Sequence, residues 1–353
     1  MTENANTNQN HASILLIYTG GTIGMIENPE TGTLEAFDFR HLKDHMPELK
    51  KTEYRVESCR FEPPLDSSEM GPEGWRRIAE IIAGNYSLYD GFVVLHGTDT
   101  MAYTASALSF MLENLGKPVV LTGSQLPIGM LRTDGKENLI TAIEIAAAKE
   151  KGLPIVPEVC IFFENTLLRG NRTRKMNADH FNAFRSYNYP PLAQAGVHIR
   201  YDTSQVYYPL LRKPLKVHYG LDPNIAILKL FPGMSPCVVE SILHTPGLKG
   251  VVMETFGCGN APCDEWFLQL LKEATEKGIV IVNITQCPAG CVEMHRYETG
   301  KKLPETGVIS GHDSTTESAV VKLMFLFGQG MGTEEVKEYM QCSLIGEITV
   351  GDK

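Results

Sequence analysis

The sequence has 353 residues, of which 43% are hydrophobic and 21% are charged. These values are typical of a globular protein with a sizeable core, and the length corresponds to about two domains. The formal net charge of −10 argues against a nucleic-acid partner, which would require clustered Lys and Arg. No apolar stretch is long enough to span a bilayer, and the polar residues 1–12 lack the apolar core of a signal peptide. We therefore expect no nucleic-acid or membrane partner, a disordered tail over residues 1–12 and a cytoplasmic location.

The cysteines and histidines argue against a metal site. The eight cysteines contain no C-x-x-C spacing, and the pairs Cys258/Cys263 and Cys287/Cys291 have no matching histidine cluster. The ten histidines show no H-E-x-x-H pattern. We expect no metal, and cysteines that remain thiols in a reducing compartment.

The first predicted strand ends in a glycine-rich turn. The apolar run Ile14–Ile17 is typical of a buried parallel strand, and Thr19-Gly20-Gly21-Thr22-Ile23-Gly24 follows it. Adjacent glycines let the backbone turn sharply and leave Thr22 at the carboxyl end of the strand, where α/β sheets bind ligands. Alone, such a turn equally connects a strand to a helix or cradles a phosphate. The polar segment from Met25 to Glu35 is predicted to be a loop beside Thr22, either a lid or a surface excursion.

Further predicted strands of the first half also end in small polar or basic residues. These strands and the residues that follow them are Gly91–Leu95 before His96-Gly97-Thr98-Asp99-Thr100, Pro118–Leu121 before Thr122-Gly123-Ser124-Gln125, and Val159–Phe163 before a loop containing Arg169–Lys175. His96 is expected to be structural, and the basic loop is expected to be solvated.

Two predicted helices flank these turns. Asp66-Ser67-Ser68 precede an amphipathic helix; capping explains one of the three, and the others are free to contact an amino-acid ligand. The second helix begins near Met101, with Thr100 or Asp99 as its N-cap, and continues to Leu115. A third helix is predicted over 138–149.

The second half repeats the strand–helix pattern after a proline-rich linker over 205–223. Strands are predicted over 225–230, 250–255 and 279–285, and helices after Ser235, from Asp264 to Lys277, and over 315–328 and 333–342. The G-x-G at Gly257 lacks a third glycine, and the chain has no P-loop, so no nucleotide cofactor is expected. The sequence thus predicts a two-domain α/β fold with a tail over 1–12, a larger N-terminal domain over 13–204, the linker, and a smaller C-terminal domain over 224–353.

The residues at the strand ends suggest acyl transfer to water. A threonine hydroxyl such as that of Thr22 becomes a nucleophile when a neighbour takes its proton. Lys175, neutral in a crevice of hydroxyl groups, is able to do so through Thr98. Asp99 would hold Lys175 or bind a substrate ammonium group, and backbone N–H groups at the glycine turns would hold an oxyanion. No metal, flavin or nicotinamide is implied.

Two of these motifs give a specific resemblance. Thr19–Gly24 and His96–Met101 are similar to the two signature motifs of bacterial L-asparaginases, and three other segments match that family as well: Asp66–Met70, Thr122–Gln125 and Arg169–Lys175. The resemblance covers about residues 14–347, and the stretch from His96 to Lys117 resembles the cytosolic type I enzymes in particular.

The resemblance implies two α/β domains, the larger with a flavodoxin-like parallel sheet, and hydrolysis of L-asparagine to L-aspartate and ammonia, with possible secondary glutaminase activity. It implies that Thr22 attacks the side-chain amide and forms a β-aspartyl enzyme. Thr98, Asp99 and Lys175 would handle protons, and Asp99 would also meet the substrate amine. The remaining implied substrate contacts are Asp66, Ser67 and Ser68. It further implies no cofactor, a homotetramer built from intimate dimers, and a regulatory asparagine site at Glu254, Thr285, Gln286 and Cys287.

Two positions depart from the family pattern. Several members carry a lid tyrosine where this chain has Gly32-Thr33-Leu34, which shifts the expected activation of Thr22 toward Thr98 and Lys175. Glu254 stands where a type I enzyme has an arginine, and its carboxylate would repel a ligand carboxylate. We therefore expect weak or absent regulation by asparagine.

Two other functions remain open at this point. The amidase subunit of glutamyl-tRNA transamidation would require an additional N-terminal domain and a tRNA-facing surface, whereas this chain is acidic and its first strand starts near residue 13. A non-catalytic amino-acid sensor would keep Ser67 and Asp99 but would not require Thr22, Thr98 and Lys175 together.

Overall fold

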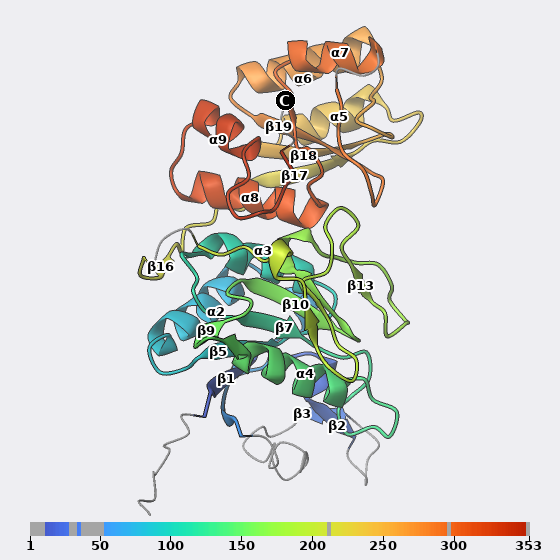
Figure 1. The fold of residues 1–353 in the computed structure, drawn as a ribbon. Helices are drawn as coiled ribbons and strands as arrows, with labels where there is room; N and C mark the ends of the chain where they lie inside the picture. The colour runs from blue at the N-terminus through green and yellow to red at the C-terminus, as the bar shows by residue number, and fades with distance from the viewer. Residues whose placement is uncertain (1–10, 28–33, 37–52, 210–212, 295–297, 351–353) are drawn as a thin grey trace, which may run out of the picture.

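The computed structural model describes residues 11–27, 34–36, 53–209, 213–294 and 298–350, which form two stacked α/β bodies (Figure 1). The blue-to-green body contains an eight-stranded sheet, and the yellow-to-red body contains a four-stranded sheet. The predicted two-domain α/β fold is confirmed. Residues 1–10 of the predicted tail lie outside the described residues.

The large sheet is parallel in its centre and antiparallel at one side. Its strand order is β15-β14-β11-β10-β7-β5-β1-β4. The five strands from β4 to β10 run parallel, and β11, β14 and β15 are antiparallel. β5, β7 and β10 are buried at every position, which explains their uninterrupted apolar sequences. The bounds are β1 (Ser13–Tyr18), β4 (Arg55–Arg60), β5 (Gly91–Leu95), β7 (Val119–Thr122), β10 (Val159–Phe163), β11 (Thr166–Arg169), β14 (Ala193–Gln194) and β15 (Arg200–Tyr201).

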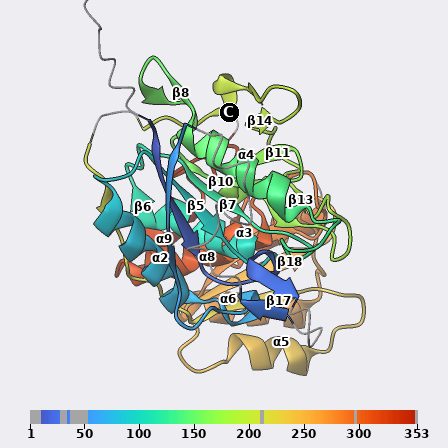
Figure 2. The same cartoon turned by 90° about the horizontal axis from the view of Figure 1, so that it is seen from below.

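Helices cover both faces of the large sheet (Figure 2). α2 (Pro72–Asn85) and α3 (Met101–Met111) pack with Leu15 and Ile17 of β1 in one apolar cluster. α4 (Gly135–Ala147) packs with Ile14 and Leu16 in a second cluster on the opposite face. Because successive strand residues point to opposite faces, both faces are closed and the carboxyl ends of the strands are left as the open edge.

Several predicted boundaries were wrong. α3 ends at Met111 rather than Leu115, because Leu112–Glu113 form β6, which pairs with β16 (Lys216–Val217) inside the predicted linker. The segment from Met25 to Glu35 contains two short antiparallel strands, β2 (Met25–Glu27) and β3 (Leu34–Ala36), rather than loop alone. Residues 28–33, which include Gly32 and Thr33, lie outside the described residues.

Two strands were not predicted for identifiable reasons. β4 is an edge strand that carries Arg and Glu, so it lacks an apolar run. β11 reverses on β10 at once, so Arg169 ends a strand rather than lying in a loop. The remaining short elements of this half are β8 (Lys149–Glu150), β9 (Leu153–Pro154), β12 (Arg174–Lys175), β13 (Phe184–Arg185) and the 3₁₀ turns η1 (Thr22–Gly24), η4 (Ser67–Glu69), η5 (Gly170–Arg172) and η6 (Thr203–Gln205).

The C-terminal sheet is wholly parallel, with the order β17-β18-β19-β20. Its long strands were predicted, whereas β20 is only two residues long and α7 contains Pro304, a residue that argues against a helix interior. The bounds are β17 (Ile225–Lys229), β18 (Gly250–Thr255), β19 (Val280–Thr285), β20 (Ile309–Ser310), α5 (Pro236–Leu243), α6 (Glu265–Glu276), α7 (Glu298–Glu305), α8 (Thr316–Gly328) and α9 (Thr333–Met340).

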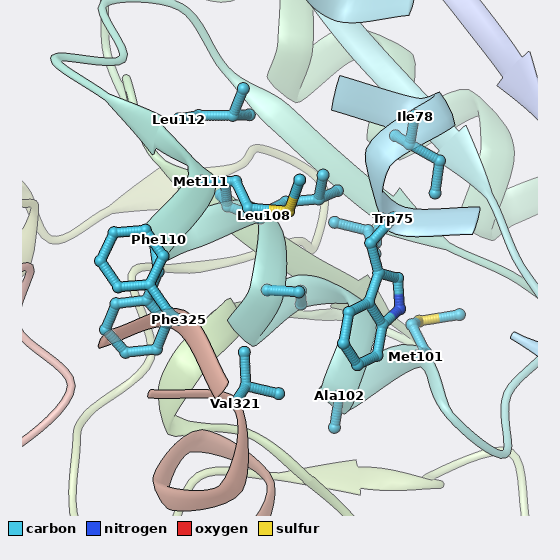
Figure 3. Close-up of a cluster of buried hydrophobic side chains, with 14 of the residues drawn as sticks. Trp75, Ile78, Met101, Ala102, Leu108, Phe110, Met111, Leu112, Val321 and Phe325 are labelled. Carbon is cyan, nitrogen blue, oxygen red and sulfur yellow. The ribbon is translucent and has the colours of Figure 1, made fainter. Parts of the chain in front are cut away.

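The two domains share one apolar core. α3 of the first domain packs against α8 of the second, and the rings of Phe110 and Phe325 stack with centroids 5.7 Å apart (Figure 3). The cluster continues from Trp75 on α2 to Val321 on α8 without a break. This contact places the C-terminal domain beside the loops that follow the large sheet. None of the helices in the described ranges is long and apolar enough to cross a bilayer.

Candidate active site

The turn after β1 lies directly against two neighbouring turns. Gly20 and Gly21 have φ values of 140° and 89°, a region that side chains rarely adopt. A Cβ on Gly20 would lie 1.9 Å from the carbonyl oxygen of Leu65, and one on Gly21 would lie 2.5 Å from Cα of Gly97. Both glycines are therefore required by contact as well as by conformation, and they fix the backbone that carries Thr22.

The turn after β5 is packed in the same way. A Cβ on Gly97 would lie 2.6 Å from Oγ of Ser67, and one on Gly123 would lie 2.4 Å from the carbonyl oxygen of His96. The glycines thus let four turns from distant parts of the sequence approach closely. This contact brings together the segments that carry Thr22, Ser67 and Thr98.

Lys175 connects to the turn after β5 through two short hydrogen bonds. Its Nζ lies 2.8 Å from Oγ1 of Thr98 and 2.6 Å from Oδ1 of Asp99. The Lys175 side chain is 18% exposed and that of Asp99 is 65% exposed. Lys175 is held in place because β12 pairs with β13, opposite Phe184. The structure therefore brings together three of the four predicted catalytic side chains by direct contact, and it places the turn of Thr22 beside them.

Asp66, Ser67 and Ser68 form the start of η4. Oδ1 of Asp66 accepts hydrogen bonds from the backbone N–H and the hydroxyl of Ser68, each at 2.8 Å. These two bonds hold the pKa of the Asp66 carboxyl below its usual range. Ser67 is buried, and its carbonyl oxygen accepts a hydrogen bond from the hydroxyl of Thr100 at 2.6 Å. Asp66 thus acts as the cap of η4, and Thr100 precedes α3 without a side-chain capping bond.

Gln125 and Asp134 support the Thr98 side of the site. Oε1 of Gln125 lies 3.5 Å from Oγ1 of Thr98, and its Nε2 donates to the carbonyl oxygen of His180. The carboxylate of Asp134 accepts from the backbone N–H groups of Gln125 and Leu126. Sequence reasoning missed Asp134. An acidic residue just before a helix is nevertheless a recognisable signal, because the positive end of the helix dipole favours a negative charge there.

His96 is a structural residue in this arrangement. Its ring is buried, and burial lowers its pKa to about 4. The ring is therefore neutral near pH 7, and both nitrogens contact protein atoms: Oγ1 of Thr104 at 2.8 Å and the carbonyl oxygen of Gly97 at 2.6 Å.

The expectation that the basic segment Arg169–Lys175 is a solvated loop was wrong. Arg169 and Arg172 are buried, and each pairs with a carboxylate, Arg169 with Glu158 and Arg172 with Asp313, both at 2.8 Å. Arg172 also donates to the carbonyl oxygen of Gly346 at 2.7 Å. Asp313 and Gly346 are distant from Arg172 in the sequence, so the one-dimensional pattern could not reveal them. They fix the segment that ends in Lys175 against the C-terminal domain.

The residues of the predicted regulatory site already bind one another. Glu254 is buried, forms an ion pair with Lys229 at 3.0 Å and accepts a hydrogen bond from Thr316 at 2.6 Å. The hydroxyl of Thr285 accepts from the backbone N–H of Cys287 at 3.0 Å. Nε2 of Gln286 donates to the carbonyl oxygens of Leu230 and Glu254, at 2.7 and 2.8 Å, and the side chain of Cys287 is exposed.

The described ranges contain no group of three or more His, Cys, Asp or Glu side chains arranged to hold a metal ion. All eight cysteines, which lie in those ranges, are free thiols.

Comparison with known proteins identifies the family. The profile described as "Asparaginase, N-terminal" matches residues 13–207, and "Glutaminase/Asparaginase C-terminal domain" matches residues 224–340. The chain belongs to the asparaginase family. It is similar to L-asparaginase 1 of Escherichia coli (strain K12), with 46% identity over 96% of this chain and 99% of that protein.

Two further relatives extend this result. The crystal structure of L-asparaginase I from Vibrio cholerae superposes with a TM-score of 0.88, at 44% identity, over 96% of this chain and 100% of that one. A mouse protein named 60 kDa lysophospholipase is 43% identical over 96% of this chain, but the match spans only 62% of that longer protein. The match to L-asparaginases thus extends over both domains.

Proposed function

We propose that this protein hydrolyses L-asparagine to L-aspartate and ammonia, with Thr22 as the nucleophile. The observation that carries the proposal is the contact of Lys175 with both Thr98 and Asp99, beside the glycine turn of Thr22. The family membership and the 46% identity to an L-asparaginase support the same substrate.

The proposed first half-reaction forms an ester. Oγ of Thr22 attacks the side-chain amide carbon, and its proton passes through the hydroxyl of Thr98 to a neutral Lys175. The carbon–nitrogen bond breaks, the leaving nitrogen takes a proton from Lys175, and ammonia departs from a β-aspartyl ester. In the second half-reaction, water attacks the ester and gives a proton to the same pair, and Thr22 recovers its proton as aspartate leaves.

The proposed site places the substrate amine beside Lys175. In the free enzyme, Oδ1 of Asp99 lies 2.6 Å from Nζ of Lys175. The α-ammonium group of asparagine, bound at the exposed Asp99, would share that carboxylate with Lys175.

Other groups complete the proposed site. Asp66, Ser67 and Ser68 would contact the α-amino and α-carboxylate groups, with Thr98 and Asp99 contributing as well. Activation by a lid residue is not part of the proposal, because Thr33 stands where several relatives carry a tyrosine; that segment lies outside the described residues. We further propose a cytoplasmic homodimer or homotetramer with secondary activity on L-glutamine.

Ammonia release from L-asparagine, with L-glutamine in parallel, tests the proposal. Thr22→Ala is expected to lose at least about 10³-fold in kcat while retaining its melting temperature, because removal of a nucleophile commonly costs several orders of magnitude. The matched control Thr22→Ser keeps a hydroxyl and is expected to retain measurable turnover. A folded wild-type protein that binds asparagine without releasing ammonia would instead be an amino-acid sensor.

We also propose that asparagine regulates this protein weakly or not at all. The buried Glu254 already has Lys229 and Thr316 as partners, and its charge opposes a ligand carboxylate. The rate is therefore expected to depend hyperbolically on asparagine concentration. A sigmoidal curve that Thr285→Val or Cys287→Ala makes hyperbolic would contradict this interpretation.

A further inference from the structure

A hydrogen-bond chain connects the core of the N-terminal domain to the turn that carries Thr98. It starts at the indole of Trp75 on α2, passes through the hydroxyl of Thr104 on α3 and reaches the ring of His96 after β5. Nε1 of Trp75 lies 3.0 Å from Oγ1 of Thr104, which lies 2.8 Å from Nε2 of His96. Nδ1 of His96 lies 2.6 Å from the carbonyl oxygen of Gly97. Figure 3 shows Trp75 among the side chains around α3, beside Met101 and Ala102.

The chemistry of each group determines whether it donates or accepts in this hydrogen-bond chain. A carbonyl oxygen only accepts, so Nδ1 of His96 must carry the ring proton and donate it to Gly97. Burial keeps the ring neutral near pH 7, so Nε2 has no hydrogen and must accept from the Thr104 hydroxyl. The indole N–H of Trp75 only donates, so it donates to the oxygen of Thr104. The direction of every bond is thus determined from Trp75 to Gly97.

The chain ends on a peptide unit that cannot move freely. The carbonyl of Gly97 belongs to the peptide bond that leads into Thr98. The same glycine is wedged between Gly21, which precedes Thr22, and Oγ of Ser67. A small rotation of this peptide would shift Thr98 relative to both Thr22 and Lys175.

We propose that Thr104, through His96, is a positioning residue for the reaction, because its hydrogen bond holds the imidazole ring that donates to the Gly97–Thr98 peptide. This inference rests on the proposed function, since it assigns Thr98 to proton transfer from Thr22. Loss of the Thr104 hydroxyl leaves the buried Nε2 without a donor and removes the bond that fixes the ring on that side. The ring is then free to tilt, and the bond from Nδ1 to the carbonyl of Gly97 weakens.

The proposed substrate contacts of Asp66 and Ser68 are expected to survive this change. These two residues bind each other, and neither is linked to Thr104 in the described residues. Ser67 lies against Gly97, and Thr98 and Asp99 follow it, so KM is expected to change as well, but less than kcat.

The test compares Thr104→Val, which replaces the hydroxyl with a methyl group, with Thr104→Ser, which keeps the hydroxyl. Ser106→Ala is the matched control: Ser106 is buried on the same helix, and its hydroxyl donates only to the carbonyl of Ala102. We expect Thr104→Val to lower kcat by about 10-fold or more with KM within about threefold, a size typical of small displacements of a catalytic group. Thr104→Ser and Ser106→Ala should remain within about threefold of wild type.

Trp75→Phe keeps the test valid if Thr104→Val does not fold. It removes the distal N–H and replaces the indole with a smaller ring, and we expect a decrease in kcat of about two- to fivefold, consistent with one neutral hydrogen bond. Equal kcat in Thr104→Val and Ser106→Ala would overturn the proposal, and so would an equal loss of kcat in Thr104→Ser and Thr104→Val. If Thr104→Val does not fold, an unchanged kcat in Trp75→Phe would overturn it. A wild-type protein that releases no ammonia from asparagine would overturn the proposed function itself, a result clearly distinct from these three.

Discussion

The charged side chains at the two ends of the segment Arg169–Lys175 lie in opposite environments. At its beginning, Arg169 and Arg172 are buried, and each is paired with a buried carboxylate. At its end, Lys175 contacts Thr98 and the largely exposed Asp99. The first end fixes the segment to the protein interior, and the second places an amine beside a largely exposed carboxylate.

The same difference between buried, paired charges and accessible ones extends beyond this segment. The C-terminal anchor, which we define as Asp313 with residues 345–349, receives Arg172 through Asp313, Gly346 and Thr349. A second buried pair, Lys322–Glu347, holds the same anchor from α8, with its side chains 1% and 0% exposed. A buried ion pair that loses one partner leaves an uncompensated charge, whereas an accessible one does not. Substitutions in the anchor should therefore affect stability, and substitutions among the strand-end turns should affect rate.

The largest expected effect tests the rate side of this comparison. Lys175→Arg keeps the positive charge but cannot act as a base, because a guanidinium does not release its proton near neutral pH. Lys175→Met removes the charge as well. Both are expected to lower kcat for ammonia release by about 10²-fold or more, with melting temperatures close to wild type. Near wild-type turnover in Lys175→Arg would assign this residue to charge placement rather than to proton transfer.

The sequence alone predicted that the polar residues at the strand ends lie near one another. Thr22, Thr98 and Asp99 follow apolar strands directly, and parallel strands present their carboxyl ends at one edge. Proximity along the chain and the period of the strands were therefore sufficient to bring them together. Lys175 was predicted only as a member of the group of strand-end residues, because the reversal of β11 on β10 that carries it across is a tertiary event.

The anchor could not be predicted in the same way. Arg172 and Asp313 are 141 residues apart, and nothing local distinguishes a buried arginine from a solvated one. Lys322 lies within the apolar part of α8, and its partner Glu347 belongs to a turn after the last helix. The pairing of Arg172 with Asp313 depends on how the two domains dock, which in turn depends on the contact of α3 with α8.

The second prediction tests the stability side. Glu347→Gln leaves the buried ammonium of Lys322 without its counter-charge, and we expect a loss of about 3–5 kcal/mol in the free energy of unfolding. The double variant Lys322→Met with Glu347→Gln removes both charges and should recover most of that loss. Urea unfolding of the three proteins measures the difference, and kcat of the folded fraction should remain within about threefold of wild type. If Glu347→Gln kept the stability of wild type but strongly reduced kcat, the two regions would not differ in the way we propose.

The smallest expected effect concerns Asp66, an exposed carboxyl at the strand ends that nevertheless has a structural role. The backbone N–H and hydroxyl of Ser68 lower its pKa in the folded state. A lowered folded pKa contributes stability above the unfolded value, about 3.9, and this contribution is lost as the pH falls through the folded value. Asp66→Asn keeps an acceptor oxygen but removes the charge, so its melting temperature should lie about a degree below wild type at pH 6, and the two should converge as the pH falls below the folded pKa of Asp66. A gap in melting temperature that persists in acid would show that the oxygen geometry of the cap, rather than its charge, stabilises η4. Asp66 would then have a structural role like that of the anchor residues, although it is exposed.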